Sequence, residues 1–467
     1  MTGLERMARG EKLRVLDLFA GAGGLSLGFQ RAGFRIDGAV ELDPLAARTH
    51  ARNFHPEDRD RHGIARDMTS TEPRELLAAL GLDGIDVLVG GPPCQAYARI
   101  GRAKLRDIAA NPAAYKVDPR GDLYLRYLAW VKTLRPLALL VENVPDILHY
   151  GHHNVVEEMV EALEVLGYTA RYSLINSAFH GCPQMRDRVF LIAYRKELGV
   201  EARFPAASRF LTLPRGYAGT RAVALRHVGA GYLPAGPGDA SLPGPVTARE
   251  AIGDLAPVLG HSVKRGARRF FTLSRYAAPD DFSAYTALMR RWPGFEAGEG
   301  VHDHVIRALP RDGPIFSAMR SGAEYPEAHA TARTLAAAEA ARLGLAEGGA
   351  AWHALFARMV PPYDVGKFPN RWWKLDPDQP VRTLMAHIGK DTYSHIHWDS
   401  AQARTISVRE AARLQGFPDG FVFEGTMNPA FRQIGNAVPP PMAAAIAGTM
   451  LETLRAAATR LAAPLAA

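Results

Sequence analysis

The sequence is poor in cysteine and contains no long hydrophobic run. Two cysteines in 467 residues are too few for a disulfide framework, which favours a reducing compartment such as the cytoplasm. No apolar stretch is long enough to cross a bilayer, and the N-terminal residues lack the apolar segment of a signal peptide. The sequence therefore argues against a membrane protein, a secreted disulfide-rich protein and a membrane partner.

The composition is that of an ordinary globular protein, with 47% hydrophobic and 22% charged residues. The length is sufficient for a large core and favours two domains. The formal net charge of +8 suits a polyanionic partner such as nucleic acid. An arginine-rich proteome would give the same charge, and composition alone leaves that alternative open.

A cysteine at the end of a stiff loop is the most distinctive local feature. Residues 86–95 read D-V-L-V-G-G-P-P-C-Q, in which Val87–Val89 is typical of a buried parallel strand. Pro92 and Pro93 each fix φ and remove a backbone donor. Cys94 is thus expected just beyond the carboxyl end of a strand, where open α/β sheets bind ligands. A small buried hydrophobe is the commoner role of a free cysteine, and this stretch alone does not exclude it.

Two earlier strands carry the features of a nucleoside site. The strand predicted at 13–19 runs into a turn that contains Gly21, Gly23 and Gly24, which lets the backbone approach a ligand closely. The strand predicted at 36–41 ends in Glu41, at the distance along the chain where such sites place a ribose-binding carboxylate. Asp43 and Pro44 begin a helix. The pattern favours an adenosine-type cofactor, although a plain strand-to-helix turn would look similar.

The rest of the first 200 residues alternates strands and helices. A third strand unit is expected to end near Asp67 and Met68, which makes the strand before Cys94 the fourth. Apolar residues recur at helical spacing from Leu123 to Leu134, and a buried strand at 138–141 leads to Glu142. A carboxylate at this place is costly to bury unless it has a catalytic role or a partner. A cap or a hydrogen bond to a neighbouring loop would explain it equally well, and the stretch favours neither reading.

Polar signals continue to the last predicted strand of this half. Asn154 and Glu157 form a pair like a capping box at the start of a helix that ends at Gly167, and a strand is expected at 168–177. Arg186 and Arg188 precede a strand at 189–194 and would share one face of an extended segment. They are either ligands of one anionic or carbonyl-rich group or two solvated arginines.

Seven sequence blocks in order resemble the DNA (cytosine-5) methyltransferases of bacterial restriction-modification systems. They run from Asp17 to Pro440 and read D-L-F-A-G-A-G-G, E-L-D, G-G-P-P-C-Q, V-E-N-V, Q-M-R-D-R-V-F, V-R-E-A-A-R-L-Q-G-F-P-D and R-Q-I-G-N-A-V-P-P. The resemblance implies an α/β fold: an S-adenosylmethionine-dependent, Rossmann-like sheet domain with a second, smaller target-recognition domain. The expected divisions are 1–200 for the catalytic domain, 201–429 for recognition, and 430–467 for a helix that returns to the catalytic domain.

The resemblance assigns a catalytic group, and the chemistry supports it independently. Carbon 5 of cytosine is a poor nucleophile, and a thiolate that adds to carbon 6 makes it a better one. Cys94 is the implied nucleophile, and Glu142 matches the glutamate that gives a proton or strong hydrogen bond to N3, for which it must be protonated. Arg186 and Arg188 match the arginines that hold the base carbonyl and the nearby backbone. A target base in a duplex must be flipped out to be reached.

The resemblance also implies S-adenosylmethionine as the cofactor. Glu41 would bind the ribose, Leu42 would pack on the adenine, and Asp67 and Met68 would flank that ring. The full implied cofactor site is Phe19, Ala20, Gly21, Gly23, Gly24, Glu41, Leu42, Asp67, Met68, Pro92, Leu123 and Asn436.

The stretch from 201 to 399 holds none of the catalytic blocks, and the resemblance makes it the target-recognition region. The basic run 264–269 suits phosphate contact or a solvated loop, and Arg371–Lys374 suits either a nucleic-acid surface or a packed tryptophan pair. Residues 330–345 predict a scaffold helix. The segment 382–393 resembles one that contacts the DNA strand, and 409–419 resembles the block that organises the recognition domain.

No metal site is expected. His387, His395 and His397 lie in one region, but only one pair is closely spaced and no cysteine accompanies them.

The sequence thus predicts a monomeric cytoplasmic enzyme, associated with the nucleoid, that acts on double-stranded DNA, with a separately acting restriction endonuclease left open. A tRNA methyltransferase would not need so large a recognition region, and a DNA-binding protein without catalysis would not need Cys94 and Glu142. A nicotinamide dehydrogenase leaves Pro-Pro-Cys-Gln unexplained. The target sequence cannot be read from the chain, because base readout depends on side-chain register.

Overall fold

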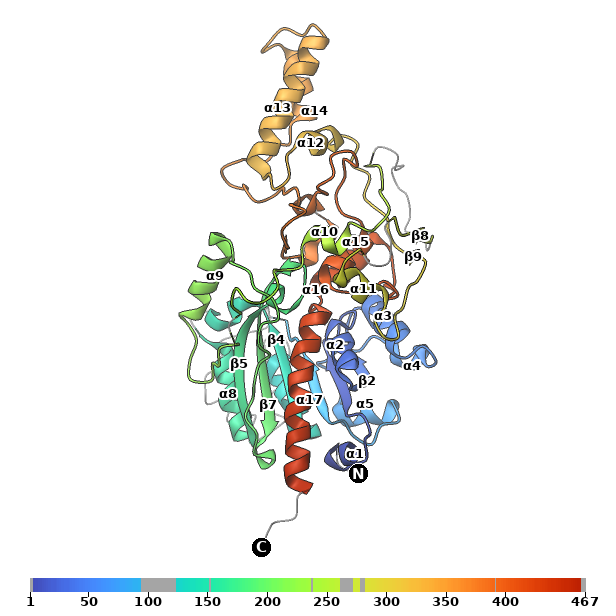
Figure 1. Ribbon diagram of the computed structural model, residues 1–467, viewed down its shortest axis with the longest axis vertical. Helices are drawn as coiled ribbons and strands as arrows, with labels where there is room; N and C mark the ends of the chain where they lie inside the picture. Colours follow the sequence, from blue (N-terminus) through green and yellow to red (C-terminus); the bar gives the residue numbers. More distant parts are fainter. Residues whose placement is uncertain are drawn as a thin grey trace. The chain divides into compact units, whose positions relative to one another are not determined.

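The computed structural model describes residues 3–93, 123–150, 153–236, 238–260, 272–277, 282–390 and 392–462 (Figure 1). The chain forms two compact units. The first comprises Met1–Pro245, Val422–Glu424 and Ala437–Ala467, and the second comprises Val246–Phe421 and Gly425–Asn436. None of the helices in the described part has the length and apolar character needed to span a membrane.

A six-stranded sheet in the order β2-β1-β3-β4-β7-β5 forms the centre of the first unit. β1 pairs in parallel with β2 and β3, and β3 pairs in parallel with β4, whereas β7 is antiparallel to both β4 and β5. Its strands are β1 (Arg14–Leu18), β2 (Arg35–Val40), β3 (Val87–Gly90), β4 (Ala138–Asn143), β5 (Tyr168–Asn176) and β7 (Asp187–Arg195). The sheet is therefore mixed, with one reversed strand between two parallel neighbours.

The prediction of a strand that ends near Asp67 and Met68 was wrong. Between β2 and β3, all of whose intervening residues are described, no further strand joins the sheet, so the strand before Cys94 is the third in the chain. The Asp67 side chain accepts from the Thr69 backbone N–H at 2.8 Å, and the Asp67 carbonyl accepts from the Thr71 N–H at 2.9 Å. These local bonds close a turn where an extended strand would need its backbone groups free for pairing.

Alternating side chains divide the core of the first unit into two layers. Leu88 faces the layer formed with α5, α7 and α8, whereas Val87 and Val89 face the layer formed with α2 and α17. This alternation is the period-two pattern of a strand buried on both faces, and each such side chain stabilises the fold by about 1.5–3 kcal/mol. The α-helices in the described part of this unit are α1 (Gly3–Ala8), α2 (Gly24–Ala32), α3 (Pro44–Phe54), α4 (Arg59–His62), α5 (Pro73–Ala79), α7 (Leu123–Leu134), α8 (Val155–Val165), α9 (Arg215–Leu225) and α17 (Pro440–Ala462).

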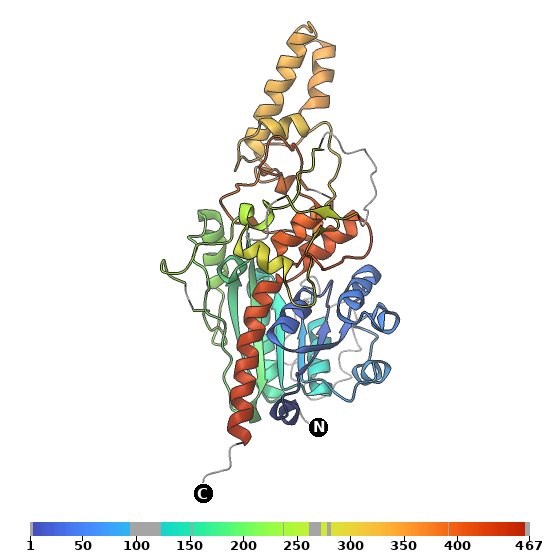
Figure 2. The ribbon, with the colours of Figure 1, turned by 45° about the vertical axis from the view of Figure 1, so that its right-hand side comes forward.

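The C-terminal helix α17 belongs to the first unit and runs along α2 (Figure 2). The two helices come very close at Gly28, where a Cβ would lie 2.4 Å from the Cβ of Ala443. Glycine is therefore required at this crossing. The contact explains why a helix more than 400 residues away in sequence completes the hydrophobic layer over the sheet.

Residues 201–245 belong to the first unit and not to the second, which moves the expected boundary. The Tyr172 N–H donates to the Gly231 carbonyl at 3.0 Å, and the Leu233 N–H donates to the Tyr172 carbonyl at 2.8 Å, so this segment pairs with β5, the edge strand of the sheet. Residues 430–436 in turn belong to the second unit. Unpaired backbone groups at a sheet edge favour such cover.

The helix after Asn154 begins as expected, but its cap is only half of a capping box. The Asn154 side chain accepts from the Val156 and Glu157 backbone N–H groups, each at 3.1 Å. The Glu157 carboxylate instead accepts from the Tyr172 hydroxyl at 2.8 Å and the Gly231 N–H at 3.0 Å. Glu157 thus fastens the covering segment to the sheet edge.

The second unit is mostly helical and irregular. Its alanine-rich helix α13 was expected at 330–345 and begins five residues earlier, at Tyr325; α13 and α14 form an antiparallel hairpin (Figure 2). Its elements are α10 (Ala248–Ile252), α11 (Ala284–Arg290), α12 (Gly313–Ala318), α13 (Tyr325–Arg342), α14 (Ala350–Met359), α15 (Val408–Gln415), α16 (Met427–Asn436), β8 (Ser274–Arg275), β9 (Gly300–Val301) and β10 (Val381–Arg382).

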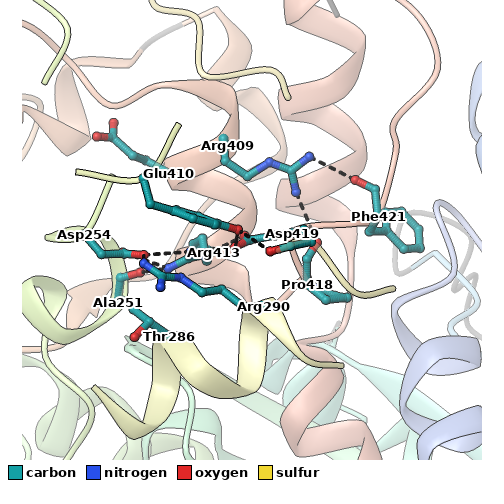
Figure 3. A network of polar contacts seen from close by, with 12 residues as sticks. Ala251, Asp254, Thr286, Arg290, Arg409, Glu410, Arg413, Pro418, Asp419 and Phe421 are labelled. Carbon is teal, nitrogen blue, oxygen red and sulfur yellow. Dashed lines mark hydrogen bonds and ion pairs between the residues drawn. The ribbon is translucent and has the colours of Figure 1, made fainter. Parts of the chain in front are cut away.

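A buried ionic network around α15 joins distant parts of the second unit (Figure 3). The Arg413 guanidinium donates to Asp254 Oδ1 at 3.0 Å and to both carboxylate oxygens of Asp419 at 2.5 and 2.6 Å. Arg290 donates to the same Asp254 at 2.6 Å. Burial alone would raise the pKa of Asp419, but the charge and hydrogen bonds of Arg413 outweigh burial and lower it. The predicted organising block 409–419 therefore acts as the polar centre of this unit.

Arg413→Met is expected to lower the free energy of unfolding of the second unit by about 3–5 kcal/mol, because it leaves the Asp419 carboxylate buried without its cation. Thermal or urea unfolding would measure this change. Arg320→Ala is the control: Arg320 also pairs with a carboxylate, that of Glu327, but its side chain is 73% exposed. That exposed pair should contribute less than about 1 kcal/mol. Equal effects of the two substitutions would contradict a structural role for Arg413.

Candidate active site

The ends of four neighbouring strands form one row, and the predicted site residues come directly after it. Val40 of β2, Leu18 of β1, Gly90 of β3 and Val141 of β4 lie side by side in the sheet register. The residues that follow them are Glu41, Phe19, Gly91 and Glu142. The chain runs from β1 to β2 on one side and continues to β3 on the other, which is the switch point where open α/β sheets bind ligands.

Among the three predicted glycines, only Gly21 faces open space. A Cβ at Gly21 would meet no atom within 4 Å, whereas one at Gly23 would lie 2.4 Å from the Phe54 ring, and one at Gly24 would lie 2.3 Å from the Val438 carbonyl oxygen. Gly23 and Gly24 therefore allow close packing against α3 and the start of the C-terminal segment. Phe19, just before this turn, adopts a φ of 59°, which is uncommon for a residue with a side chain.

Glu41 is fixed at the mouth of the glycine turn. Its Oε2 accepts from the Gly21 N–H at 2.8 Å, and its Oε1 accepts from the Asp43 N–H at 2.7 Å. Burial raises the pKa of Glu41, and the two backbone hydrogen bonds oppose that rise. The neighbouring Leu42 is 65% exposed although it is apolar. A fixed carboxylate beside an exposed leucine and an open glycine fits the ribose and base of a nucleoside.

Of the other predicted cofactor residues, Asp67 and Met68 lie in a turn that is bonded to the end of β2. The Arg66 N–H donates to the Glu41 carbonyl at 2.8 Å, which brings the turn with Asp67 and Met68 to the end of β2. Met68 is buried, and its carbonyl accepts from Arg126 of α7 at 2.9 Å.

The last predicted cofactor residues come from both units. Ala20 donates its N–H to the Val40 carbonyl at 3.2 Å, and Leu123 begins α7. Asn436 is the exposed last residue of α16 and belongs to the second unit, and its role in the cofactor site stays a prediction.

The loop that leads to the predicted nucleophile is held by the end of β4. Cys94 itself lies outside the described residues, which end at Pro93 and resume at Leu123. The buried Asn143 side chain donates to the Pro92 carbonyl at 2.7 Å. At Gly91 a Cβ would lie 2.9 Å from Glu142 Oε2, so the absent side chain gives the carboxylate room against the loop. Asn143 thus joins the site, although sequence reasoning did not single it out.

Glu142 and Arg188 form an ion pair beside this loop. Arg188 Nε lies 2.9 Å from Glu142 Oε1, and both side chains are mostly buried. Burial lowers the pKa of Arg188, and the Glu142 charge opposes this shift. Arg186 is fully buried, and burial, followed by the charge of Arg188, lowers its pKa. The alternative of two solvated arginines was therefore wrong.

The reversed strand β7 explains how the arginines reach this row. In the antiparallel pairing Glu142 lies opposite Phe190 and Asn143 lies opposite Val189, so Arg188 arrives at the carboxyl end of β4. A parallel strand in the same place would put residues 186–188 at the opposite end of the strands, away from Glu142. The site therefore combines the carboxyl ends of four strands with the amino end of one, β7.

In the second unit, part of the predicted nucleic-acid surface is core. Trp372 is fully buried and stacks on Tyr393 with ring centroids 4.6 Å apart. Lys374 is also buried, and its ammonium donates to the Phe316 and Met319 carbonyls at 2.7 and 2.8 Å. Trp372 and Trp373 are both buried, so the alternative of packed tryptophans was right. The basic run 264–269 lies outside the described residues, and DNA contact by 382–393 stays a prediction.

The histidines of the same region have separate partners. His395 Nε2 lies 3.2 Å from the Arg382 carbonyl oxygen, and His397 Nδ1 accepts from the Asp399 N–H at 3.1 Å. Among the residues described, no group of three or more histidine, cysteine, aspartate or glutamate side chains is arranged to hold a metal ion.

The chain thus has a mixed α/β sheet with a fixed carboxylate, an open glycine turn and a carboxylate–arginine pair at its switch point, as expected of a nucleoside-dependent α/β enzyme. The family model described as C-5 cytosine-specific DNA methylase matches residues 13–228 and 352–452. The chain belongs to this family.

Relatives along nearly the whole length agree with the assignment. A protein of Oceanobacillus iheyensis, provisionally named as the type II methyltransferase M.OihORF3336P, is 37% identical over 94% of this chain and 96% of its own. The type II methyltransferase M.AgeI of Thalassovita gelatinovora is 29% identical over 94% of this chain and 99% of its own. A crystal structure of a prophage-encoded protein from E. coli, provisionally named a DNA modification methyltransferase, shares the fold with a TM-score of 0.60, 23% identity and coverage of 95% and 99%.

The chain is therefore a DNA cytosine methyltransferase of the bacterial restriction-modification type, and DNA is its substrate. Its fold class was predicted correctly from the sequence.

Proposed function

We propose that this enzyme transfers a methyl group from S-adenosylmethionine to carbon 5 of a cytosine that is flipped out of a short, specific duplex sequence, through a covalent bond between Cys94 and carbon 6. The observation that carries this proposal is the ion pair between Glu142 and Arg188. Its Glu142 carboxylate lies against Gly91, which precedes Cys94 by three residues. A carboxyl group and two arginines beside a thiol-bearing loop suit a ring that must be polarised before attack.

The groups at the ends of β1 and β2 suit the proposed cofactor. Glu41 would accept from the ribose hydroxyls, Leu42 would pack on the adenine, and the open backbone at Gly21 would allow close approach. Phe19, Ala20, Asp67, Met68, Pro92, Leu123 and Asn436 remain further proposed members of the pocket. When bound, S-adenosylmethionine supplies an electrophilic methyl group on a sulfonium.

The protein side chains would prepare the base. Cys94 attacks carbon 6 as the thiolate, and the electron pair moves toward carbon 5 while Glu142 gives a proton to N3. In the structure, Arg188 pairs with Glu142, which acts there as a carboxylate acceptor. A base that enters between them would exchange this ion pair for a hydrogen bond from the acid form of Glu142. Arg186 and Arg188 would then hold the base carbonyl and the nearby backbone. Loss of the carbon 5 proton and departure of the thiolate complete the reaction.

The second unit is the proposed target-recognition domain. Its position in the sequence between the catalytic segments and its size support that role. We further propose that the enzyme acts as a monomer in the cytoplasm, separately from any cognate endonuclease.

A base-resolution map of 5-methylcytosine in cells that express the enzyme tests this function. Methylation confined to one short motif, absent from cells with an empty vector, would support the proposal and would identify the target. A blank map from folded protein would contradict it. Incubation with tRNA and duplex DNA in competition would then test the alternative of a tRNA substrate.

A further inference from the structure

Helix α9 is an unusual feature of the segment 201–245, because none of its residues is fully buried. Its Ala224 and Leu225 are partly buried against the core of the sheet, and its Arg221 side chain bonds to the sheet directly. Arg221 Nη2 donates to the Leu174 carbonyl of β5 at 2.6 Å, and Arg221 Nη1 forms an ion pair with Asp187 of β7. These contacts place a cation from outside the family's sequence blocks directly beside the Q-M-R-D-R segment.

Asp187 lies between Arg186 and Arg188 in the sequence. The Arg188 side chain contacts the backbone of Asp187. Arg188 Nη1 donates to the Asp187 carbonyl at 2.7 Å, while Arg188 Nε pairs with Glu142 at 2.9 Å. The charges therefore alternate from Arg221 through Asp187 and Arg188 to Glu142. Each member contacts the next through a side chain or through the backbone of the same residue.

The Asp187 carboxylate depends on Arg221. Burial raises the pKa of Asp187, and the Arg221 charge is the first of the interactions that oppose the rise. A mostly buried carboxylate that loses its cation is costly, so it takes up a proton or moves toward water. Either change would disturb the first residue of β7, next to Arg188.

The segment that carries Arg221 is held at a second place near the site. The His227 ring, just after α9, stacks on the His149 ring with centroids 3.8 Å apart. His149 ends the short helix Pro145–His149 that follows β4 and Glu142. Further along, residues 229–233 are bonded to the edge strand β5. Arg221 therefore comes from a backbone that is fixed after the helix, as a positioning side chain requires.

We infer that Arg221 is a positioning residue of the methyltransferase: through Asp187 it holds the start of β7 so that Arg188 and Glu142 keep the geometry needed to polarise the cytosine. This inference rests on the proposed roles of Glu142 and Arg188. It assigns a catalytic contribution to a segment that the sequence blocks would leave to target recognition.

Arg221→Ala is expected to lower kcat by about 10- to 100-fold, because displacements of about 1 Å in a catalytic group have effects of this size. The KM for S-adenosylmethionine should stay within about twofold, since the proposed cofactor pocket lies at the ends of β1 and β2. Arg221→Lys keeps the cation and should recover most of the rate. Arg226→Ala is the matched control, because Arg226 follows the same helix and is exposed.

A double-mutant cycle separates positioning from general stability. If Arg221 acts through Asp187, then Arg221→Gln and Asp187→Asn together should lower kcat by clearly less than the product of their separate effects. Arg221→Gln retains a donor for the Leu174 carbonyl and serves if the alanine variant does not fold. Thermal unfolding of each variant accompanies the kinetics.

Three results would overturn the inference: equal kcat for Arg221→Ala and Arg226→Ala, failure of lysine to restore the rate of a folded protein, or independent effects in the double-mutant cycle. Wild-type protein and Arg226→Ala that both leave duplex DNA unmethylated would instead contradict the proposed function, and the inference would fall with it. The activity of these two proteins thus distinguishes the two failures.

Discussion

Cys94→Ala is expected to abolish methyl transfer to DNA, with a loss of at least about 10⁴-fold, because the variant has no atom that can add to carbon 6. Binding of duplex DNA and cofactor should persist, since the glycine turn and Glu41 are formed by other strands. The measurement is transfer of labelled methyl groups to DNA containing the mapped motif. Duplex with 5-fluorocytosine at the target should trap a covalent complex with wild-type protein and none with the variant.

The second cysteine of the chain supplies the control. Cys182 is fully buried, and burial raises the pKa of its thiol to about 12, so it is almost entirely unreactive at neutral pH. Cys182→Ala removes a small hydrophobe from the core and should leave the rate within a few-fold of wild type. Substantial turnover by Cys94→Ala would disprove the covalent mechanism. If the trapped adduct disappeared in Cys182→Ala, the nucleophile would be Cys182 and not Cys94.

Glu142→Gln is expected to lower kcat by about 10²–10⁴-fold, the usual range for loss of a general acid. Glutamine keeps the shape of the side chain and a carbonyl oxygen for Arg188, and it can offer an N–H to N3. It cannot give N3 a proton. The KM for S-adenosylmethionine should change little, because Glu142 lies near the end of β4 whereas Glu41 follows β2.

An exposed glutamate of the same unit tests whether charge alone matters. Glu201 is 71% exposed, and Glu201→Gln removes the same formal charge. Its rate should equal that of wild type within about twofold, as for most surface substitutions. If Glu142→Gln retains the wild-type rate, Glu142 has no part in the chemical step, and the proton to N3 must come from another group.

Local sequence was sufficient where one short segment contains both the structural and the chemical signal. The strand predicted at 87–89, which runs to Gly90, and the helix at 123–134 were predicted because apolar residues form a continuous run or follow a helix period along the segment itself. The turn at 67–71 defeated this reasoning, since an Asp67 side chain that bonds its own backbone leaves no periodic trace. Glu157 shows the same limit, because its partners Tyr172 and Gly231 lie far along the chain.

The order of residues along the chain was enough to predict that Phe19, Glu41, Gly91 and Glu142 would lie at the same end of the strands of one sheet. Apolar runs end where chemistry-bearing residues begin, and that order is written in the chain.

The three-dimensional arrangement was needed to learn which strands are neighbours, that β7 is reversed, and that residues 201–245 cover the sheet edge. Those choices place Arg188 against Glu142 and Arg221 against Asp187. They depend on long-range packing and backbone pairing between segments, whose free energies no single stretch of sequence contains.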